Sequence, residues 1–389
     1  MSSYCFNQYI DALKPSASIA LAGKANALAA SGREILNLTI GEPNFATPAA
    51  VVETAVNAIR EGDTHYKPGR GIQPLRERIA QKLREENGIA CDAANVLVTP
   101  GAKFAIYAAV CTLLNAGDEA IVLDPCWVSY SAMIQAAGGV VKAVECSYDT
   151  NHVITLELLE SAWTPKTRLL IVNTPNNPTG RMLSEREAAD IAAFAKKHRV
   201  YVIADEIYEK IVYDGNRHIS LGANAEIADL VVTVNGLSKC AAMTGWRIGY
   251  LTGTKEIVDK IYMLYQHALT CISGFGQQAA VTAFDCTAEL AQLRAAFERR
   301  RNRFAETISA SPAIRCRKPE GAFYAWANFD YKGMDGYAIS DYLLETTGVM
   351  GVPGDAYGQG GKTCIRFSLA ASDAVIDAAA ARIADAMSK

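Results

Sequence analysis

The middle of the chain alternates short apolar runs of strand length with longer segments of helical pattern. The runs are Val96–Val98, Ala120–Leu123, Leu169–Val172, Tyr201–Ala204 and Leu230–Val234. Between two of them lies Glu185–His198, which follows an N-cap serine, Ser184, and ends in basic residues that suit a helix C-terminus. Strands joined by crossover helices form parallel sheets. The alternation therefore predicts an α/β fold with a mostly parallel sheet flanked by helices.

The pattern changes after Phe284. A charged helix is predicted over Glu289–Ile308, followed by aromatic-rich strands at Gly321–Phe329 and Thr363–Leu369 and by a final alanine-rich helix. The first 45 or so residues carry no long strand run, and a chain of 389 residues is long enough for two domains. We expect a large domain over 48–285 and a smaller α+β domain formed by 1–47 and 286–389.

Charge and hydropathy exclude several classes of partner. The chain has 38 Lys and Arg against 41 Asp and Glu and no basic block, so neither nucleic acid nor an anionic membrane is an expected partner. The longest stretch without a charged residue, Ile261–Phe284, carries three glutamines and a histidine, which argues against a membrane helix. Met1–Asp11 has no basic residue and no apolar run of the kind found in secretory signals. We expect a cytoplasmic protein.

The ten cysteines are scattered singly, without a C-x-x-C pair or a histidine at metal-ligand spacing. We interpret them as reduced thiols and expect no metal site.

Polar residues follow four of the apolar runs, at the edge of a parallel sheet where ligands bind. These segments are Thr99–Lys103, Asn173–Gly180, Asp205–Tyr208 and Asn235–Lys239. One edge of the sheet is therefore predicted to gather amides, an acid, a phenol and a lysine.

Three of these groups suggest a cofactor. A helix beginning at Gly101 presents free N–H groups that suit a phosphate. Lys103 lies in its first turn, where the helix dipole disfavours a cation unless an anion is bound nearby; the alternative is a solvated surface lysine. Lys239 follows a buried strand where desolvation and a cation such as Arg247 would favour a Schiff-base amine; the alternative is an ordinary loop lysine. Asp205 is either solvated or pairs with a cation such as a protonated ring nitrogen. Together they fit pyridoxal 5′-phosphate.

Longer motifs make the resemblance specific. Val172–Gly180, Ala204–Tyr208, and Ser238–Lys239 followed by Met243–Tyr250 resemble, in order and spacing, the fold-type-I, class I/II aminotransferases. The match runs from about Ala17 to the C-terminus. Further segments are most similar to the bacterial and archaeal aspartate aminotransferase subgroup: Leu38–Phe45, Tyr66–Pro68 and Asp124–Tyr130. The resemblance implies a large domain with a mostly parallel seven-stranded sheet, and a homodimer with active sites at the subunit interface.

The resemblance also implies roles around the cofactor. Lys239 would form the Schiff base and carry the proton between the substrate α-carbon and the cofactor. Asp205 would keep the pyridine nitrogen protonated, Tyr208 and Asn177 would hydrogen-bond the phenolic oxygen, and Trp127 would stack on the ring. The phosphate would be held by the following groups: backbone N–H groups of Gly101 and Ala102 beside Lys103, the side chains of Ser238 and Arg247, and Tyr66 from the second subunit.

For the substrate, Arg366 matches the family arginine that grips the α-carboxylate, helped by the Gly41 backbone and by Asn177. The alternative is a buried arginine with a structural salt bridge, just as Trp127 and Tyr208 have alternative interpretations as core residues. Lys103, beside Trp127, would meet a distal carboxylate, and the Lys14–Ser18 segment, including Ser18, would close over it. These residues favour acidic substrates.

The leading hypothesis is an aminotransferase that moves the amino group between aspartate or glutamate and a 2-oxo acid. An elimination or replacement enzyme on the same fold and cofactor is the alternative. Some positions depart from the family pattern: Gly236 replaces a frequent serine or threonine, Tyr357 a frequent phenylalanine, and Cys126, Cys240 and Cys271 surround the site. The sequence identifies neither the physiological amino donor and acceptor nor the pathway.

Overall fold

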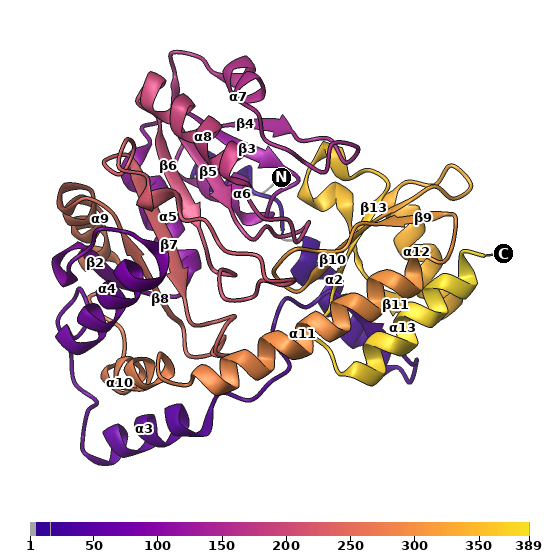
Figure 1. Ribbon diagram of the computed structural model, residues 1–389, viewed down its shortest axis with the longest axis horizontal. Helices are drawn as coiled ribbons and strands as arrows, with labels where there is room; N and C mark the ends of the chain where they lie inside the picture. The colour runs from indigo at the N-terminus through magenta and orange to yellow at the C-terminus, as the bar shows by residue number, and fades with distance from the viewer. Residues whose placement is uncertain (1–4, 16, 389) are drawn as a thin grey trace.

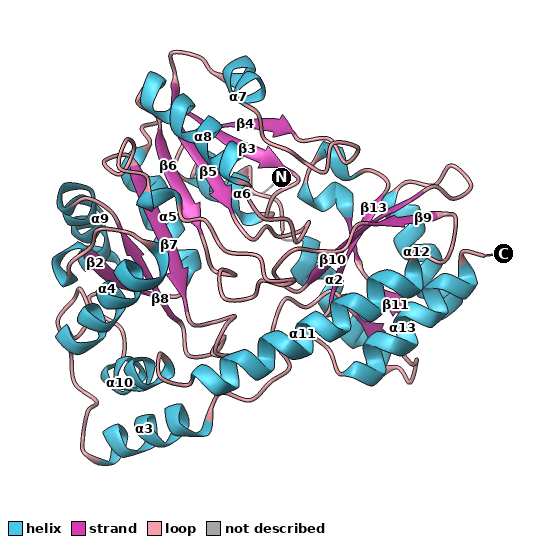
Figure 2. Ribbon diagram, in the orientation of Figure 1, coloured by secondary structure: helices cyan, strands magenta, loops and turns pink. Residues whose placement is uncertain are grey.

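A computed structural model describes residues 5–15 and 17–388. Its largest element is a seven-stranded sheet with the strand order β2-β8-β7-β6-β5-β3-β4 (Figures 1 and 2). The strands are β2 (Val96–Pro100), β3 (Glu119–Asp124), β4 (Val140–Glu145), β5 (Thr167–Asn173), β6 (Tyr201–Asp205), β7 (Val231–Gly236) and β8 (Ile248–Thr252). Only β8 runs antiparallel to its neighbours. The predicted α/β fold with a mostly parallel seven-stranded sheet is confirmed.

Helices surround this sheet, as Figure 1 shows. They are α3 (Ala49–Arg60), α4 (Gln73–Asn87), α5 (Ala102–Leu113), α6 (Ser129–Ala136), α7 (Leu156–Ala162), α8 (Glu185–His198), α9 (Lys255–Ala268) and α10 (Gly274–Ala283). Every residue of β7 is buried, as expected for a strand covered on both faces. Helix α8 has the predicted bounds, and its Ser184 N-cap forms a capping box with Glu187.

A second body of the fold is built from distant parts of the chain. Its four-stranded antiparallel sheet has the order β12-β13-β10-β9, and a short parallel pair joins β1 to β11. The strands are β1 (Leu36–Asn37), β9 (Ile314–Cys316), β10 (Tyr324–Phe329), β11 (Val349–Met350), β12 (Val352–Pro353) and β13 (Cys364–Ser368). Leu36 and Leu38 share a hydrophobic core with residues between Phe304 and Met387. Residues from the two ends of the chain thus pack together.

The helices of this region are α2 (Ala17–Ala30), α11 (Thr287–Ile308), α12 (Gly336–Thr347) and α13 (Asp373–Ala386), with the short 3₁₀ helices η3 (Gly354–Tyr357) and η4 (Gln359–Gly361). Three further short helices contact elements of the large sheet region: α1 (Gln8–Asp11), η1 (Ala93–Asn95) and η2 (Leu221–Ala223). In Figure 1, α11 runs from the neighbourhood of α10 to that of α12 and α13. It thereby links the two parts of the molecule. The predicted charged helix and the aromatic-rich strands correspond to α11, β10 and β13.

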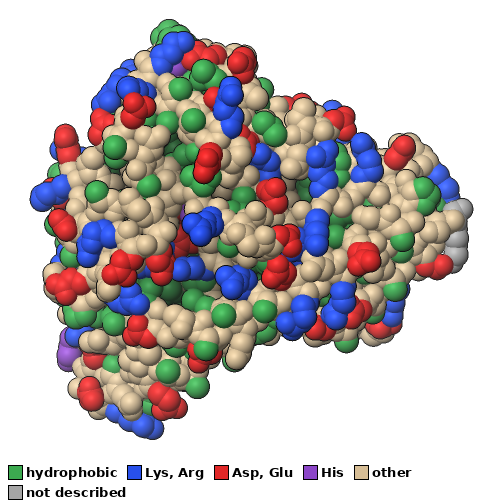
Figure 3. Space-filling model, in the orientation of Figure 1, with side chains coloured by type: hydrophobic (Ala, Val, Ile, Leu, Met, Phe, Trp, Pro, Cys, Tyr) green, Lys and Arg blue, Asp and Glu red, His purple; other side chains and the backbone are tan. Residues whose placement is uncertain are grey.

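None of the described helices is both long and apolar enough to cross a bilayer. The uncharged stretch that ends at Phe284 is divided between α9 and α10. On the face shown in Figure 3, acidic and basic side chains are interspersed.

The fold brings the polar strand ends together. Asn173, at the end of β5, pairs with Asp205 at the end of β6. Asp205 in turn pairs with Val234 of β7, two residues before that strand ends at Gly236. The segments that follow these strands therefore meet at one edge of the sheet, as the sequence predicts.

Candidate active site

A cavity of about 400 Å³ opens at this edge of the sheet. Its lining comes from both parts of the molecule, from Ile19 to Arg366. The predicted site residues that line it are Gly41, Ala102, Lys103, Trp127, Asn177, Asp205, Tyr208, Ser238, Lys239, Arg247 and Arg366. The structure therefore brings together most of the residues that the sequence selects.

Lys239 lies between the two parts of the molecule. Its Nζ donates a hydrogen bond to the carbonyl oxygen of Gly41 at 2.5 Å. Burial lowers the pKa of Lys239 to about 8; the Glu42 carboxylate opposes this change, whereas the Arg366 and Arg247 guanidinium groups add to it. The amine is therefore much easier to deprotonate than an exposed lysine, which a nucleophilic or proton-transferring lysine requires.

Asp205 is almost fully buried at the end of β6. Its Oδ2 accepts a hydrogen bond from the Tyr130 hydroxyl at 2.6 Å, and its Oδ1 accepts one from the Ile207 N–H at 3.3 Å. Burial raises the pKa of Asp205 to about 6 in spite of these two bonds. Both donors are uncharged, so a cationic ring nitrogen in the cavity would supply the charge that this carboxylate lacks.

Arg366 is buried on β13 and directs its guanidinium to the cavity wall. Its Nη1 donates to Asn177 Oδ1 at 3.2 Å and its Nη2 to the Thr39 carbonyl at 2.6 Å. The guanidinium carbon lies 4.5 Å from the ring centre of Tyr324 and 5.1 Å from that of Tyr357. No carboxylate forms an ion pair with Arg366 among the described residues, so the alternative of a structural salt bridge has no support there.

Tyr208 lies beside this arginine. Its hydroxyl is 2.9 Å from the hydroxyl of Tyr324, and both rings are buried. Burial raises the pKa of Tyr208 well above its usual value, with the neighbouring Tyr324 and Asp205 adding to the rise. The phenol therefore stays protonated and presents a hydrogen-bond donor at the cavity.

The opposite end of the cavity is suited to an anion. Helix α5 begins at Ala102 after Gly101, whose φ is +82°. A Cβ at Gly101 would lie 2.4 Å from Arg247 Nη2, so glycine is required here both by the backbone and by the close arginine. Arg247 is held by the carbonyls of Thr244 (2.8 Å) and Pro100 (3.3 Å). A guanidinium and free helix N–H groups converge, as at phosphate sites.

The structure explains the departure at Gly236. A Cβ there would lie 2.8 Å from the carbonyl oxygen of Ile248 and 3.0 Å from the Cα of Gly249. The close pairing of β7 and β8 leaves no room for a serine or threonine side chain at this position. Ser238 is buried and lines the cavity instead.

Lys103 and Trp127 form one side of the entrance. Lys103 Nζ lies 4.9 Å from the centre of the Trp127 ring. Burial, and then the positive charge of Arg247, lower the pKa of Lys103. An ammonium group close to a second cation and to a helix N-terminus is stabilised by a bound anion.

Two predicted residues, Gly101 and Tyr66, do not line the cavity, and the structure does not describe the side chain of a third, Ser18. Gly101 lies behind Arg247, as described above, and Tyr66 is 86% exposed. Ser18 belongs to α2, but its side chain lies outside the described residues, as does Ser16 of the same segment.

Several contributors were missed by sequence reasoning. Tyr130, Asn173 and Tyr324 line the cavity, and Thr39 and Tyr357 contact Arg366. Tyr130, Asn173 and Thr39 lie inside or beside motifs already singled out. Tyr324 had no such signal, because it belongs to a strand whose partner, β13, lies about 40 residues further along the chain.

A comparison with protein families decides the classification. The model of aminotransferase class I and II matches residues 33–383.

The chain is a class I and II aminotransferase.

Its relatives agree. The aminotransferase is 37% identical over 381 residues to an aspartate aminotransferase of Geobacillus stearothermophilus, with 96% of each chain covered. It is 38% identical over 368 residues to an aspartate/prephenate aminotransferase of Thermus thermophilus, with 94% of each covered. A solved aspartate aminotransferase of Thermus thermophilus with maleate superimposes with a TM-score of 0.94 at 36% identity, covering 98% of this chain and all of the other.

Enzymes of this family use pyridoxal 5′-phosphate. The described residues of this aminotransferase fit that group. Arg247 and the start of α5 suit its phosphate, the uncompensated carboxylate of Asp205 suits a protonated ring nitrogen, and the pKa of Lys239 suits an amine that reacts with an aldehyde.

A second polar cluster lies outside the cavity of the aminotransferase. Glu206, Glu209 and His218 each place one ligand atom within 4.8 Å of the others. The Lys82 ammonium bonds to Glu209 and, at 2.7 Å, to Asn87 Oδ1. A protein cation thus already balances charge in this cluster.

Proposed function

We propose that this aminotransferase moves the amino group between an acidic L-amino acid, aspartate or glutamate, and a 2-oxo acid. The observation that carries the proposal is the pair of cationic side chains, Arg366 and Lys103, that line one cavity around Lys239. Arg366 has no carboxylate partner among the described residues, and Lys103 lies beside a second cation, Arg247. Two cations around one amine match the two carboxylates of a dicarboxylic substrate. The names of the relatives support the same substrate class.

Pyridoxal phosphate, when bound, supplies an electron-accepting ring that stabilises negative charge at the substrate α-carbon. Lys239 would carry the proton from that carbon to the cofactor, because its amine loses a proton near neutral pH. Asp205 keeps a proton on the ring nitrogen through its ionised carboxylate. Tyr208 and Asn177 would donate to the phenolic oxygen, and Trp127 would stack on the ring.

The remaining residues hold the two ends in place. Arg247, Ser238 and the N–H groups of Gly101 and Ala102, with Lys103 beside them, hold the phosphate. Arg366 holds the α-carboxylate in a bidentate manner, with the Gly41 backbone and Asn177 on either side. Trp127 and Lys103 would lie beside the distal carboxylate, and the segment with Ser18, whose side chain is outside the described residues, would close over that end.

We also propose a homodimer with active sites at the subunit interface. Tyr66 has a phenol that is 86% exposed and does not line the cavity of its own chain, as expected for a residue that serves the site of a second copy. The proposed domains are 48–285 and the combination of 1–47 with 286–389. The core shared by Leu36, Leu38 and the C-terminal strands supports that division.

Single-substrate reactions test the proposed activity. The cofactor-loaded enzyme is mixed with aspartate or glutamate without an oxo acid, and the 2-oxo acid, free ammonia and the cofactor absorbance are measured. We expect one equivalent of oxo acid per site, no ammonia and a lasting change in absorbance. Continuous release of ammonia would instead identify an elimination enzyme, and no reaction with either amino acid would reject the acidic substrate class.

Replacing Lys103 tests the distal carboxylate. Lys103→Met should raise the KM for aspartate by about 10- to 100-fold, because a charge-assisted hydrogen bond is lost, and leave the KM for a neutral amino acid nearly unchanged. Lys166→Met, at an exposed lysine away from the cavity, is the matched control. Equal changes for acidic and neutral substrates would contradict the assigned role.

A further inference from the structure

A short segment joins the small sheet to the end of β3. It comprises η3 and η4, residues Gly354–Gly361, between β12 and β13. The Cys126 N–H donates to the Tyr357 carbonyl at 3.0 Å. The Gln359 N–H donates to Asp124 Oδ2 at 2.7 Å. Two hydrogen bonds thus tie this segment, which we call the 354–361 segment, to the two residues on either side of Pro125.

The Asp124 carboxylate fits closely into the 354–361 segment. It is 3% exposed, and a Cβ at Gly358 would lie 1.9 Å from its Oδ1. Gly358 has a φ of +132°, so neither its backbone nor its surroundings accept another residue. Burial raises the pKa of Asp124 to about 6; the Gln359 N–H and then the Gly360 N–H oppose the rise, and Glu145 adds to it. The two N–H groups therefore favour the carboxylate form.

The same segment reaches the substrate side. The Tyr357 ring is 2% exposed and lies 5.1 Å from the guanidinium carbon of Arg366. It meets the Trp326 ring edge to face, with ring centres 5.8 Å apart. The Arg366 guanidinium therefore contacts two aromatic rings, those of Tyr357 and Tyr324.

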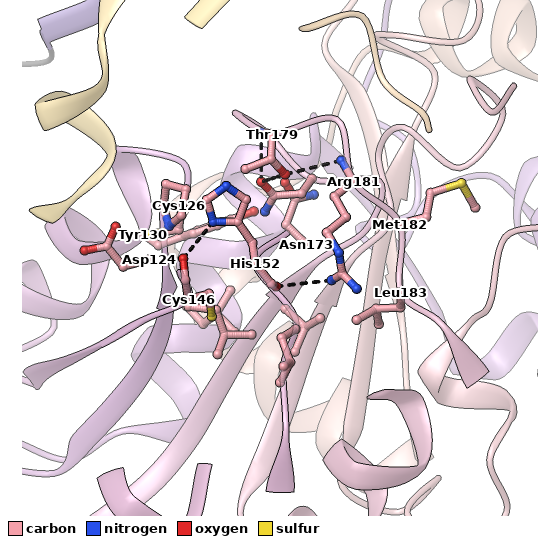
Figure 4. Close-up of a pocket in the computed structure, with 16 residues that line it drawn as sticks. Asp124, Cys126, Tyr130, Cys146, His152, Asn173, Thr179, Arg181, Met182 and Leu183 are labelled. Atoms are coloured by element: carbon pink, nitrogen blue, oxygen red, sulfur yellow. Dashed lines mark hydrogen bonds between the residues drawn. The ribbon is translucent and has the colours of Figure 1, made fainter. Parts of the chain in front are cut away.

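Packing under Asp124 is incomplete. A second cavity, of about 40 Å³, is lined by Asp124, Cys126, His152 and Arg181. Figure 4 shows Asp124 at the left of this cavity, near Cys126 and Cys146. Asp124 Oδ1, His152 Nε2 and Arg181 Nε make no hydrogen bond to described residues. No residue of the 354–361 segment lines this cavity, so the segment is tied to the end of β3 by the Gln359 and Cys126 hydrogen bonds rather than by contacts across the cavity.

We propose that Asp124 is a positioning residue for Arg366: it fixes the 354–361 segment to the large sheet and so holds the Tyr357 ring against the guanidinium that binds the substrate α-carboxylate. The inference rests on the proposed function, because it takes Arg366 as the carboxylate-binding group. Asp124 touches neither cofactor nor substrate, so its effect is on substrate affinity. Every α-amino acid and 2-oxo acid substrate should depend on it equally, whether acidic or neutral.

Three variants of the cofactor-loaded enzyme test this inference. Asp124→Ala removes the acceptor for Gln359, whereas Asp124→Asn keeps an oxygen that accepts the same N–H. Asp118→Ala is the matched control, because Asp118 Oδ2 accepts the Asn115 N–H at 2.8 Å just before the opposite end of β3. We measure KM and kcat for one acidic and one neutral amino acid, cofactor affinity, and hydrogen exchange of peptides covering 354–361.

With Asp124→Ala we expect KM to rise about tenfold for both substrates, with kcat and cofactor affinity changed less than about twofold, and faster exchange in 354–361. Asp124→Asn should stay within about threefold of the wild type, and Asp118→Ala should match it. If Asp124→Ala does not fold, Asp124→Ser takes its place, since its shorter side chain cannot reach Gln359.

Two results overturn the inference. One is an unchanged KM in Asp124→Ala while the wild type is active. The other is an equal rise in KM with Asp118→Ala. A wild type that is inactive with acidic and neutral amino acids instead refutes the proposed function. In that case faster exchange in Asp124→Ala shows only that Asp124 holds the segment, and the part of the inference that concerns Arg366 falls.

Discussion

The five residues from Asp205 to Glu209 supply two buried polar clusters whose carboxylates have pKa values shifted in opposite directions. Asp205 and Tyr208 line the cavity. Glu206 and Glu209 face a group made of Lys82, Asn87, His218 and Ser220. We call these the cavity cluster and the paired cluster.

The pKa values show the contrast. Burial opposes the ionisation of Glu209, but the Lys82 and His218 charges outweigh it and lower the pKa of Glu209 to about 2. Asp205 forms no ion pair with a described residue, the Lys239 charge only partly opposes its burial, and its pKa rises to about 6. In the paired cluster the protein satisfies its own charges; in the cavity cluster it leaves a carboxylate and an amine for a ligand. The difference separates residues that stabilise the fold from residues suited to chemistry.

The largest expected effect comes from Lys239, which lines the same cavity as the cavity cluster. Lys239→Ala should reduce transamination by at least about 10³-fold, because the proton-transferring amine is lost, while the free energy of unfolding of the apoenzyme changes little. Steady-state kinetics and urea unfolding measure both. A variant that keeps more than a tenth of the wild-type rate would refute the role of Lys239.

The paired cluster should respond in the opposite way. Lys82→Met removes the ion-pair partner of the buried Glu209 and should lower the free energy of unfolding by about 3–5 kcal/mol, with kcat per folded molecule unchanged. Lys210→Met is the matched control, since Lys210 pairs with Glu86 at the surface and such pairs contribute less than about 1 kcal/mol. If both variants lose the same stability, the distinction between the clusters fails.

The smallest effect concerns pH, and the two clusters predict opposite signs. Glu209 has a lowered pKa, so its contribution to stability is present above its unfolded pKa of about 4.5 and is lost as the pH falls toward 2. Asp205 has a raised pKa, so the folded apoenzyme binds more protons between about pH 4 and 6 and loses stability as the pH rises through that range.

Unfolding of the apoenzyme between pH 2 and 7 measures these slopes. Glu209→Gln should remove the loss in acid, and Asp205→Asn should remove the decline between pH 4 and 6. A wild-type slope that survives both substitutions would show that other groups control the pH dependence.

The sequence pattern predicted the position of several site residues but missed two strands of the large sheet. Asp205, Asn177 and Lys239 follow apolar runs, so their position at the edge of the sheet could be deduced from the pattern alone. Strand β4 was not among the predicted runs because it is largely exposed and carries Lys142 and Glu145, as an edge strand does. β8 was missed as a strand because it lies directly after the Lys239 motif and was interpreted as part of it.

Side-chain partners from distant elements were the hardest to foresee. Tyr130 was visible in a motif, but its hydrogen bond to Asp205 depends on how α6 packs beside β6. Lys82 gave no signal, because a lysine in a charged amphipathic helix is usually exposed, and only the fold shows that it is buried against Glu209. The lack of space at Gly236 likewise follows from the pairing of β7 with β8.

Leu36 pairs with Val349, and Val96 of β2 pairs with Thr252 of β8. During synthesis, about 150 residues must therefore be added after β2 before its neighbour β8 exists, and roughly 310 residues after β1 before β11 exists. Pairings of such long range fold slowly and leave strand edges open in the meantime. The nascent chain completes its catalytic pocket only when Arg366 has left the ribosome. A deletion that begins before β13 should therefore remove Arg366 and this strand of the small sheet together.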